Sequence, residues 1–223
     1  ETLSTFHMRL VNRLSEYKRF FALNSDIFIR TLFLSSAFGF FYAQSSQEGE
    51  IVLAVNVVLL QFLHWMSYII DGYAYAAEAL VGKYIGKRKK EATLKTIKLS
   101  MIWGAGMAVA FALIYGVWSE SLLRIFTDEI EVIQAAEPFL NWMILLPIFG
   151  FACYIWDGVF IGMTASVAMR NSMIVAFALY ILSWFLTKDL AGPHSLWVAL
   201  IGFLTFRGLL QTYLFKKHGL QLR

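Results

Sequence analysis

The chain has 223 residues, of which 59% are hydrophobic and only 15% are charged, and its mean hydropathy is +0.62. About 25% of the residues in an ordinary soluble domain are charged, and the core of such a domain could not absorb so much apolar surface, so the composition excludes a soluble fold. The net charge of +4 would suggest a nucleic-acid partner, but the positions of the basic residues argue against one. A single cysteine, Cys153, leaves no disulfide framework or thiolate metal site, and we expect neither a metal site nor a cofactor.

Residues 1–24 carry apolar side chains at steps of three and four, which form one stripe of a helix, and most of the basic residues lie off that stripe. We expect an amphipathic cytoplasmic helix on the inner leaflet of a membrane, and a solvated linker helix fits the pattern equally well. The stripe consists of Leu3, Phe6, Leu10, Leu14, Tyr17 and Phe21.

Six uncharged or nearly uncharged runs follow, each about as long as the 17 to 25 residues that a membrane-spanning helix requires. This pattern predicts an all-α membrane protein with six transmembrane helices, surrounded by membrane lipids. The runs are residues 27–47, 51–70, 99–118, 138–156, 171–187 and 193–215.

Lysine and arginine are distributed unequally between the two sides of the predicted membrane. Fifteen lie at the chain ends and in the second and fourth connections, and only Arg124 and Lys188 lie on the other side. Because cytoplasmic loops carry the excess of basic residues, both ends of the chain are predicted to be cytoplasmic, and the protein to be a multi-pass protein of the cytoplasmic (inner) membrane. Residues 218–223 then form a cytoplasmic tail.

The second span carries a polar stripe on an otherwise apolar helix. At 100° per residue, its polar residues and Gly82 lie within about 60° of one line. Carboxylates are expensive in lipid, so we expect Asp71 to line a cavity, whereas Glu78 near Lys83 also fits a solvated or salt-bridged position. The histidine could shuttle protons, or it could be a hydrogen-bonded packing residue. The polar members of the stripe are Asn56, His64, Ser67, Asp71, Tyr75 and Glu78.

The fourth span ends in a second acid, Asp157, which is followed by Gly158 and Gly162 at a spacing that permits close helix packing. We expect Asp157 to line the same cavity as Asp71. Arg30 and Arg207, inside the first and last spans, are interpreted as snorkelling residues.

Three long blocks resemble the multidrug and toxic compound extrusion family, in particular the C-terminal half of its DinF-like branch. The resemblance covers nearly the whole chain from Asn24 onward, and its blocks are NVVLLQFLHWMSYIIDGYAYAAEALVGKYIGKRKKEA, FTDEIEVIQAAEPFLNWMILLPIFGFACYIWDGVFIGMTASVAMRNSM and LWVALIGFLTFRGLLQ. It implies two six-helix lobes that form a twelve-helix transporter. Residues 1–24 would be the linker between the lobes, residues 25–217 the C-terminal lobe, and a homologous N-terminal lobe would lie outside this chain.

The resemblance also implies a function. Members of such a family export organic, often cationic or amphipathic, compounds in exchange for a cation, by alternating access between the lobes. By position, Asp157 matches the acid of the family's tenth helix, and residues 71–86 match its eighth. Sodium-coupled branches place an acid in the seventh helix, but the corresponding span here has only Asp26 at its mouth and Gln44 deeper. A proton is therefore favoured over sodium as the coupling ion.

Two other classes fit part of the pattern. A flippase for lipids or lipid-linked precursors, from the same superfamily, would line its cavity with several arginines, and only Arg30 and Arg207 are available. An intramembrane aspartyl protease would use two helix-borne aspartates that share a proton, but the surroundings of Asp71 and Asp157 lack the glycine-x-glycine-aspartate pattern of that class. We therefore expect a transporter, not an enzyme.

Overall fold

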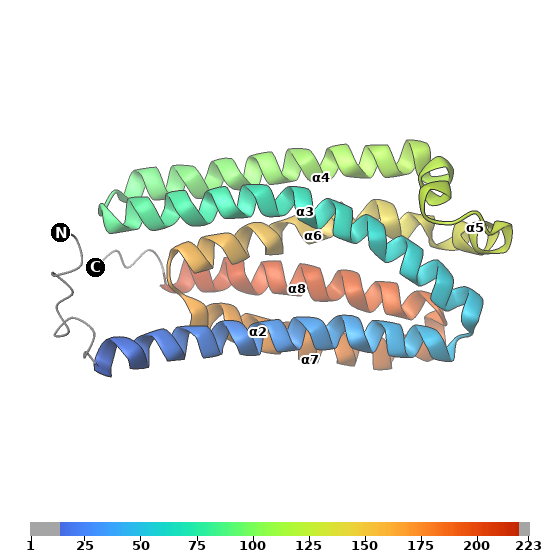
Figure 1. Ribbon diagram of the computed structural model, residues 1–223, viewed down its shortest axis with the longest axis horizontal. Coiled ribbons are helices and arrows are strands. Elements are labelled where there is room, and N and C mark those ends of the chain that lie inside the picture. Colours follow the sequence, from blue (N-terminus) through green and yellow to red (C-terminus); the bar gives the residue numbers. More distant parts are fainter. Residues whose placement is uncertain (1–13, 219–223) are drawn as a thin grey trace, which may run out of the picture.

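The computed structural model describes residues 14–218, and within that range all of the regular structure is helical (Figure 1). Residues 1–13 and 219–223 lie outside the description, as do Leu3, Phe6 and Leu10 of the predicted amphipathic stripe. The elements are α2 (Leu14–Gln47), α3 (Glu50–Gly86), α4 (Lys90–Phe126), α5 (Ile130–Ala136), the short 3-10 helix η1 (Glu137–Phe139), α6 (Leu140–Gly162), α7 (Ser166–Ala191) and α8 (His194–His218).

Six of these helices are long and apolar enough to cross a membrane, which confirms the predicted all-α fold with six transmembrane helices. Helices α3 and α4 have 37 residues each, or about 55 Å at 1.5 Å per residue, and so extend well beyond a hydrocarbon core of about 30 Å. Helix α4 is interrupted at Trp118, whose φ and ψ of −116° and 22° are not helical. Helix α2 runs without a break through the predicted boundary between residues 24 and 25, and that domain boundary stays a prediction.

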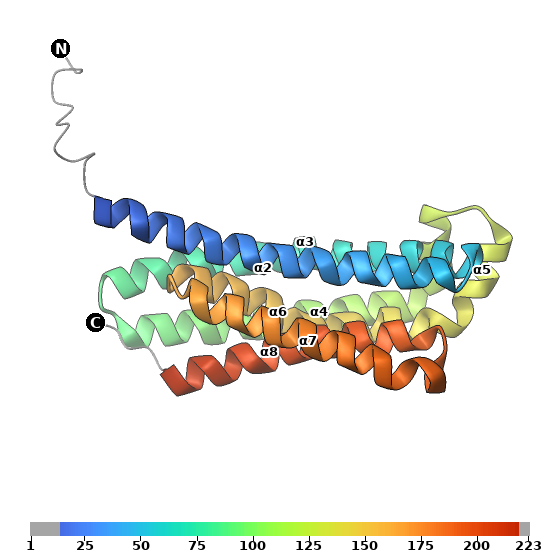
Figure 2. The same cartoon turned by 90° about the horizontal axis from the view of Figure 1, so that it is seen from below.

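The helices pack as two groups of three. Helices α3, α4 and α6 contact one another, α7 packs against both α2 and α8, and the contact between α6 and α8 joins the groups. In the apolar stretches of the two spans that contain α3 and α6, 56% of the residues are buried inside the bundle. In the corresponding stretches of α2 and α7, 17% are buried. Helices α3 and α6 are therefore central, and α2 and α7 are peripheral. Figure 2 shows α2 and α3 along one long side of the bundle and α7 and α8 along the other.

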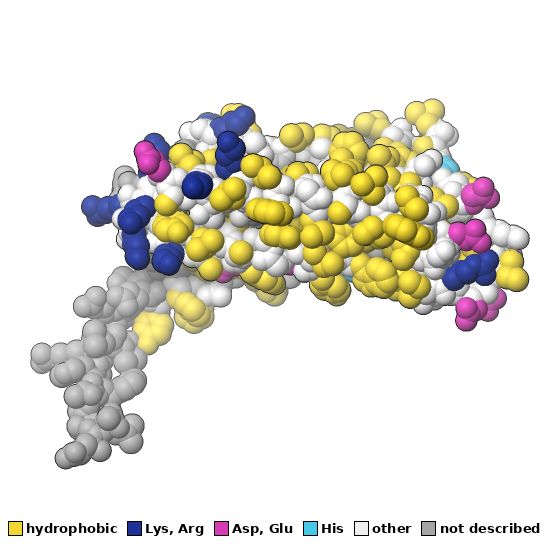
Figure 3. Space-filling view, turned by 90° about the horizontal axis from the view of Figure 1, so that it is seen from above, with side chains coloured by type: hydrophobic (Ala, Val, Ile, Leu, Met, Phe, Trp, Pro, Cys, Tyr) yellow, Lys and Arg dark blue, Asp and Glu magenta, His cyan; other side chains and the backbone are white. Residues whose placement is uncertain are grey.

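Charge is segregated to the two ends of the bundle. In Figure 3 lysine and arginine side chains gather at one end and most of the acidic side chains at the other, with an apolar belt between them. The start of α2, the end of α8 and the turns that follow α3 and α6 all lie at the basic end (Figure 1). A belt of apolar side chains between two charged ends is the surface of a multi-pass membrane protein.

Helices α3 and α6 approach each other closely enough for backbone contact. An added Cβ at Gly158 would overlap the carbonyl oxygen of Ala74, and one at Gly162 would come within 2.5 Å of the carbonyl oxygen of Glu78. Glycines four residues apart lie on one face of a helix, so together they let α6 lie directly on the backbone of α3. This close approach places Asp157, one residue before Gly158, beside the part of α3 that carries Asp71.

We predict that Gly162→Ala lowers the thermal unfolding midpoint of the purified protein. The added methyl group must push α3 and α6 apart, and overpacking of this kind costs about 1–3 kcal/mol. Gly106→Ala on α4 is the matched control, because no atom lies within 4 Å of its added Cβ. Equal midpoints for the two variants would contradict the close packing of α3 on α6.

Candidate functional site

A cluster of charges is buried between α2, α6 and α8, and Asp157 is at its centre. This carboxylate is 7% exposed. Its Oδ2 accepts hydrogen bonds from Nη2 of Arg207 at 2.5 Å and from Nη2 of Arg30, and its Oδ1 accepts one from Nε2 of Gln211 at 2.7 Å. Two ion pairs and an amide therefore neutralise and solvate a carboxylate that would otherwise be prohibitively costly in this position.

Helix α8 supplies two of these partners from one face. Arg207 and Gln211 are four residues apart, so their side chains project in the same direction, and both are completely buried. The Arg207 guanidinium also lies 5.5 Å from the ring centre of Tyr154, one turn before Asp157 on α6, which is a cation–π distance. A hydrogen bond of 2.8 Å from Trp156 to Thr212 adds a further link between α6 and α8.

Helix α2 is held by two ion pairs that start one helical turn apart. Asp26 accepts hydrogen bonds from Nη1 of Arg170 at 2.5 Å and from Oγ of Ser166 at 2.7 Å, both on α7. Arg30, on the next turn of α2, pairs with Asp157 on α6. Adjacent turns of α2 thus carry an acid, Asp26, that pairs with a base on α7, and a base, Arg30, that pairs with an acid on α6.

Beside the cluster is a cavity of about 220 Å³ between α2, α3 and α6. Asp71 and Asp157 both line it, and they differ in their partners. Asp157 is fully paired, whereas among residues 14–218 no ion pair or hydrogen bond reaches the carboxylate of Asp71. The cavity is lined by Arg30, Leu34, Asp71, Ala74, Tyr75, Glu78, Tyr154, Asp157, Gly158 and Ile161.

Four of the seven site residues predicted from the sequence meet at this cavity: Asp157, Asp71, Tyr75 and Glu78. The part of the polar stripe from Asp71 to Glu78 is therefore the part of α3 that faces the cavity. The roles of these residues stay predictions, and Tyr75 is 69% exposed, so its ring reaches beyond the cavity to the surface of the lobe.

The other three predicted residues do not line the cavity. Asn56 is completely buried near the opposite end of α3, where it donates to Oγ of Ser45 at 2.9 Å and accepts from Nε1 of Trp197 at 2.8 Å. This network ties α2, α3 and α8 together. His64 lies against Phe38 on α2, with 5.9 Å between the ring centres, and Gln44 is half-buried near the end of α2.

The snorkelling interpretation of the two intramembrane arginines is wrong. Arg207 is completely buried, and Arg30 turns inward to Asp157. The cost of an unpaired charge in a membrane, which singled out the aspartates, applies equally to arginine. That rule, together with the spacing of Arg207 and Gln211, is the signal in the sequence that points to their role.

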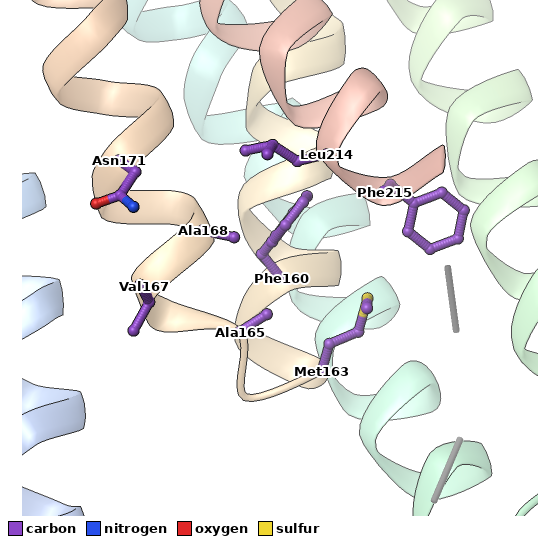
Figure 4. Close-up of a pocket in the computed structure, with 8 residues that line it drawn as sticks. All are labelled: Phe160, Met163, Ala165, Val167, Ala168, Asn171, Leu214 and Phe215. Atoms are coloured by element: carbon purple, nitrogen blue, oxygen red, sulfur yellow. The ribbon is translucent and has the colours of Figure 1, made fainter. Parts of the chain in front are cut away.

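A larger cavity of about 460 Å³ opens at the basic end of the bundle, between the end of α6, the start of α7 and the end of α8 (Figure 4). Its lining has no charged side chain and one amide, that of Asn171, which Figure 4 shows on α7. The cavity beside Asp71 is the better candidate site, because it brings several polar groups together around a small volume. The lining of the larger cavity is Phe160, Met163, Ala165, Val167, Ala168, Asn171, Leu214 and Phe215.

Six apolar spans around a buried charge cluster and a polar cavity are the features of a multi-pass membrane transporter. The MatE family model matches residues 27–187, and the chain belongs to this family of membrane efflux transporters. Its members are transporters rather than enzymes, so the aspartyl protease alternative no longer applies. The pairing of Asp157 with two arginines also differs from the shared proton that a protease would need.

Two relatives are informative. The DNA damage-inducible protein F of Escherichia coli is 36% identical over 202 residues, which are 91% of this chain and 44% of that protein. Protein DETOXIFICATION 45, chloroplastic, of Arabidopsis thaliana is 23% identical over 175 residues, which are 74% of this chain and 30% of that protein. The chain therefore spans less than half the length of each of these relatives.

Removal of Arg207 should destabilise the protein strongly. Arg207→Leu leaves Asp157 with a single guanidinium partner in a buried position, and breaking a buried pair costs about 3–5 kcal/mol. The matched control is Arg124→Leu, which breaks the exposed pair of Arg124 with Glu120 and should cost about 0–1 kcal/mol. Thermal unfolding of the purified variants measures both effects. Similar losses for the two substitutions would show that the cluster does not hold α8.

Proposed function

We propose that this chain is one lobe of a proton-coupled antiporter that exports organic, often cationic or amphipathic, compounds across the cytoplasmic membrane. Membership of the MatE family supports export as the activity. The observation that carries the rest is the cavity in which Asp71 faces Tyr75 without an ion pair among the described residues. A carboxylate beside an aromatic ring can attract an organic cation by charge and by cation–π contact.

The state of the neighbouring acids supports a proton rather than sodium as the coupling ion. Asp157 and Asp26 both have arginine partners, so neither offers a free carboxylate to a metal ion. Asp71 lacks such a partner in the described part of the chain. A half-buried carboxylate must be neutralised by a proton or by a bound cation, and we propose that proton and substrate alternate at Asp71.

We further propose that a homologous six-helix lobe covers the side of the bundle formed by α2 and α3, which gives twelve helices in all. The chain spans 44% of the Escherichia coli relative, which leaves room for a lobe of similar size. On this side large side chains of α3 are exposed, among them Tyr68 and Tyr75, and Tyr75 lines the cavity. The cavity would then open between the lobes.

A lipid flippase is less well supported. Headgroup phosphates need arginines that can reach the ligand, and of the two intramembrane arginines only Arg30 lines the cavity. Arg207 is completely buried behind Asp157. The acids Asp71 and Glu78 at the same cavity would also repel a phosphate.

The basic end of the bundle is proposed to be cytoplasmic. Cysteines introduced in place of Ser46 and Ser121, near the acidic end, should react with a membrane-impermeant thiol reagent added to whole cells, whereas one in place of Lys89 should react only after permeabilisation. The native Cys153 is buried and serves as the unreactive background. Labelling of position 89 in intact cells would reverse the orientation.

Asp71→Asn should reduce efflux of a cationic dye such as ethidium by the full-length protein. Loss of one charged contact is worth about 1.5–3 kcal/mol, which corresponds to about a 10- to 100-fold loss of dye affinity. Membrane abundance should stay at the wild-type level, because Asp71 has no partner to leave unpaired in the described structure. Glu120→Gln, an exposed acid far from the cavity, is the control. Unchanged efflux at equal abundance, or transport that depends on sodium rather than on pH, would contradict the proposal.

A further inference from the structure

The cavity and the charge cluster behind it hold five formal charges, two positive and three negative. Arg30 lines the cavity and Arg207 lies behind Asp157, whereas the acids Asp71, Glu78 and Asp157 all line the cavity. Arg207 and Asp157 already neutralise each other inside the α6–α8 contact, where Gln211 completes the coordination of the carboxylate. Arg30 is therefore a second positive charge on a carboxylate that needs only one, and it lines the same cavity as the acids Asp71 and Glu78.

The two arginines differ in how firmly they are held. Arg207 is completely buried and is stacked on Tyr154. The Arg30 side chain is 19% exposed, lines the cavity, and comes from α2, a peripheral helix. Arg30 is thus the charge of this cluster that is accessible from the cavity and least constrained by its surroundings.

We propose that Arg30 is a built-in counter-cation that takes the place of an inorganic cation beside Asp71 and Asp157, and so makes the cavity selective for organic cations over sodium. The inference rests on the proposed function, because it concerns what the same cavity binds. A hard cation such as sodium needs several oxygen ligands, and the carboxylates of Asp71, Glu78 and Asp157 are the charged oxygen donors of the cavity. Because the Arg30 guanidinium is bound to Asp157 at this cavity, a sodium ion there meets like charge instead of vacant acids.

An organic cation escapes this competition for a physical reason. Its charge is spread over a larger body, and it can contact the exposed ring of Tyr75 and the carboxylate of Asp71 at the mouth of the cavity without entering the space beside Asp157. Arg30 would thus act as a specificity-determining residue. A purely structural role, in which it only ties α2 to α6, predicts no change in which ions bind.

The test is a gain of sodium binding in the full-length protein. Arg30→Gln removes the charge but keeps a side chain that can hydrogen-bond to Asp157. We expect this variant to bind radioactive sodium saturably, about tenfold or more above the wild type, and to unfold at a higher temperature in sodium chloride than in N-methylglucamine chloride of equal ionic strength. Arg30→Lys keeps the charge and should bind no more sodium than the wild type. The double variant Arg30→Gln with Asp71→Asn should lose the gained binding.

The control is Arg124→Gln, which removes an exposed arginine from a pair with Glu120 and should leave sodium binding at the wild-type level. The proposal is overturned if Arg30→Gln binds no more sodium than the wild type, or if its sodium binding survives Asp71→Asn. A variant that folds only when sodium is present supports the proposal. A variant that stays unfolded in both salts overturns it, because a cation that replaces Arg30 should restore the fold.

A second form of the test uses one protein in two charge states. Arg30→Cys can be labelled through the cavity with an aminoethyl thiosulfonate, which restores a positive charge, or with a methyl thiosulfonate, which does not. Sodium binding should appear with the neutral label and disappear with the charged one, and equal binding with both labels would contradict the inference. These measurements need no transport, so they can fail while dye efflux still depends on Asp71, and the two proposals can be judged separately.

Discussion

The structure depends on the neutralisation of one buried carboxylate. Asp157 lies near the end of α6, buried inside the bundle, where an unpaired charge would cost several kcal/mol, and its partners come from two other spans. Arg207 binds it from α8 and Arg30 from α2. Because α6 belongs to one group of three helices and α2 and α8 belong to the other, the carboxylate of Asp157 connects the two halves of the lobe. An apolar contact could also join them, but it would not specify which faces must meet.

The close approach of α3 and α6 determines what lies next to that carboxylate. Since Gly158 and Gly162 allow the two backbones to touch, Asp71 is brought to the same cavity as Asp157. The two acids then have different tasks. Asp157 holds helices together, and in the proposed function Asp71 is left to the ligand. A site with one structural acid and one available acid can exchange a proton or a cation without loss of the fold.

Hydropathy and charge along the sequence were sufficient to predict six spans, because both properties are local. They also singled out Asp71 and Asp157, since any acid within an apolar run is conspicuous. The partners of Asp157 were missed because Arg207 and Arg30 are 50 and 127 residues away in the chain, and no local pattern links them. The stripe on α3 predicted a common face but not its neighbours. Asn56 lies on that face too, yet at its level Ser45 of α2 and Trp197 of α8 hydrogen-bond to it, and it does not line the cavity.

The arrangement of the cluster also bears on how the protein enters the membrane during synthesis. Arg30 must be inserted first and waits 127 residues for Asp157, or on the order of ten seconds at about 5–20 residues per second. The four inner charges appear in the order Arg30, Asp71, Asp157 and Arg207, with signs plus, minus, minus, plus. The summed charge of these four residues therefore never exceeds one unit as they are inserted. At most one of these four charges is thus uncompensated at a time. Insertion of one charged residue costs about 2.5–3.5 kcal/mol, which a long apolar span can offset.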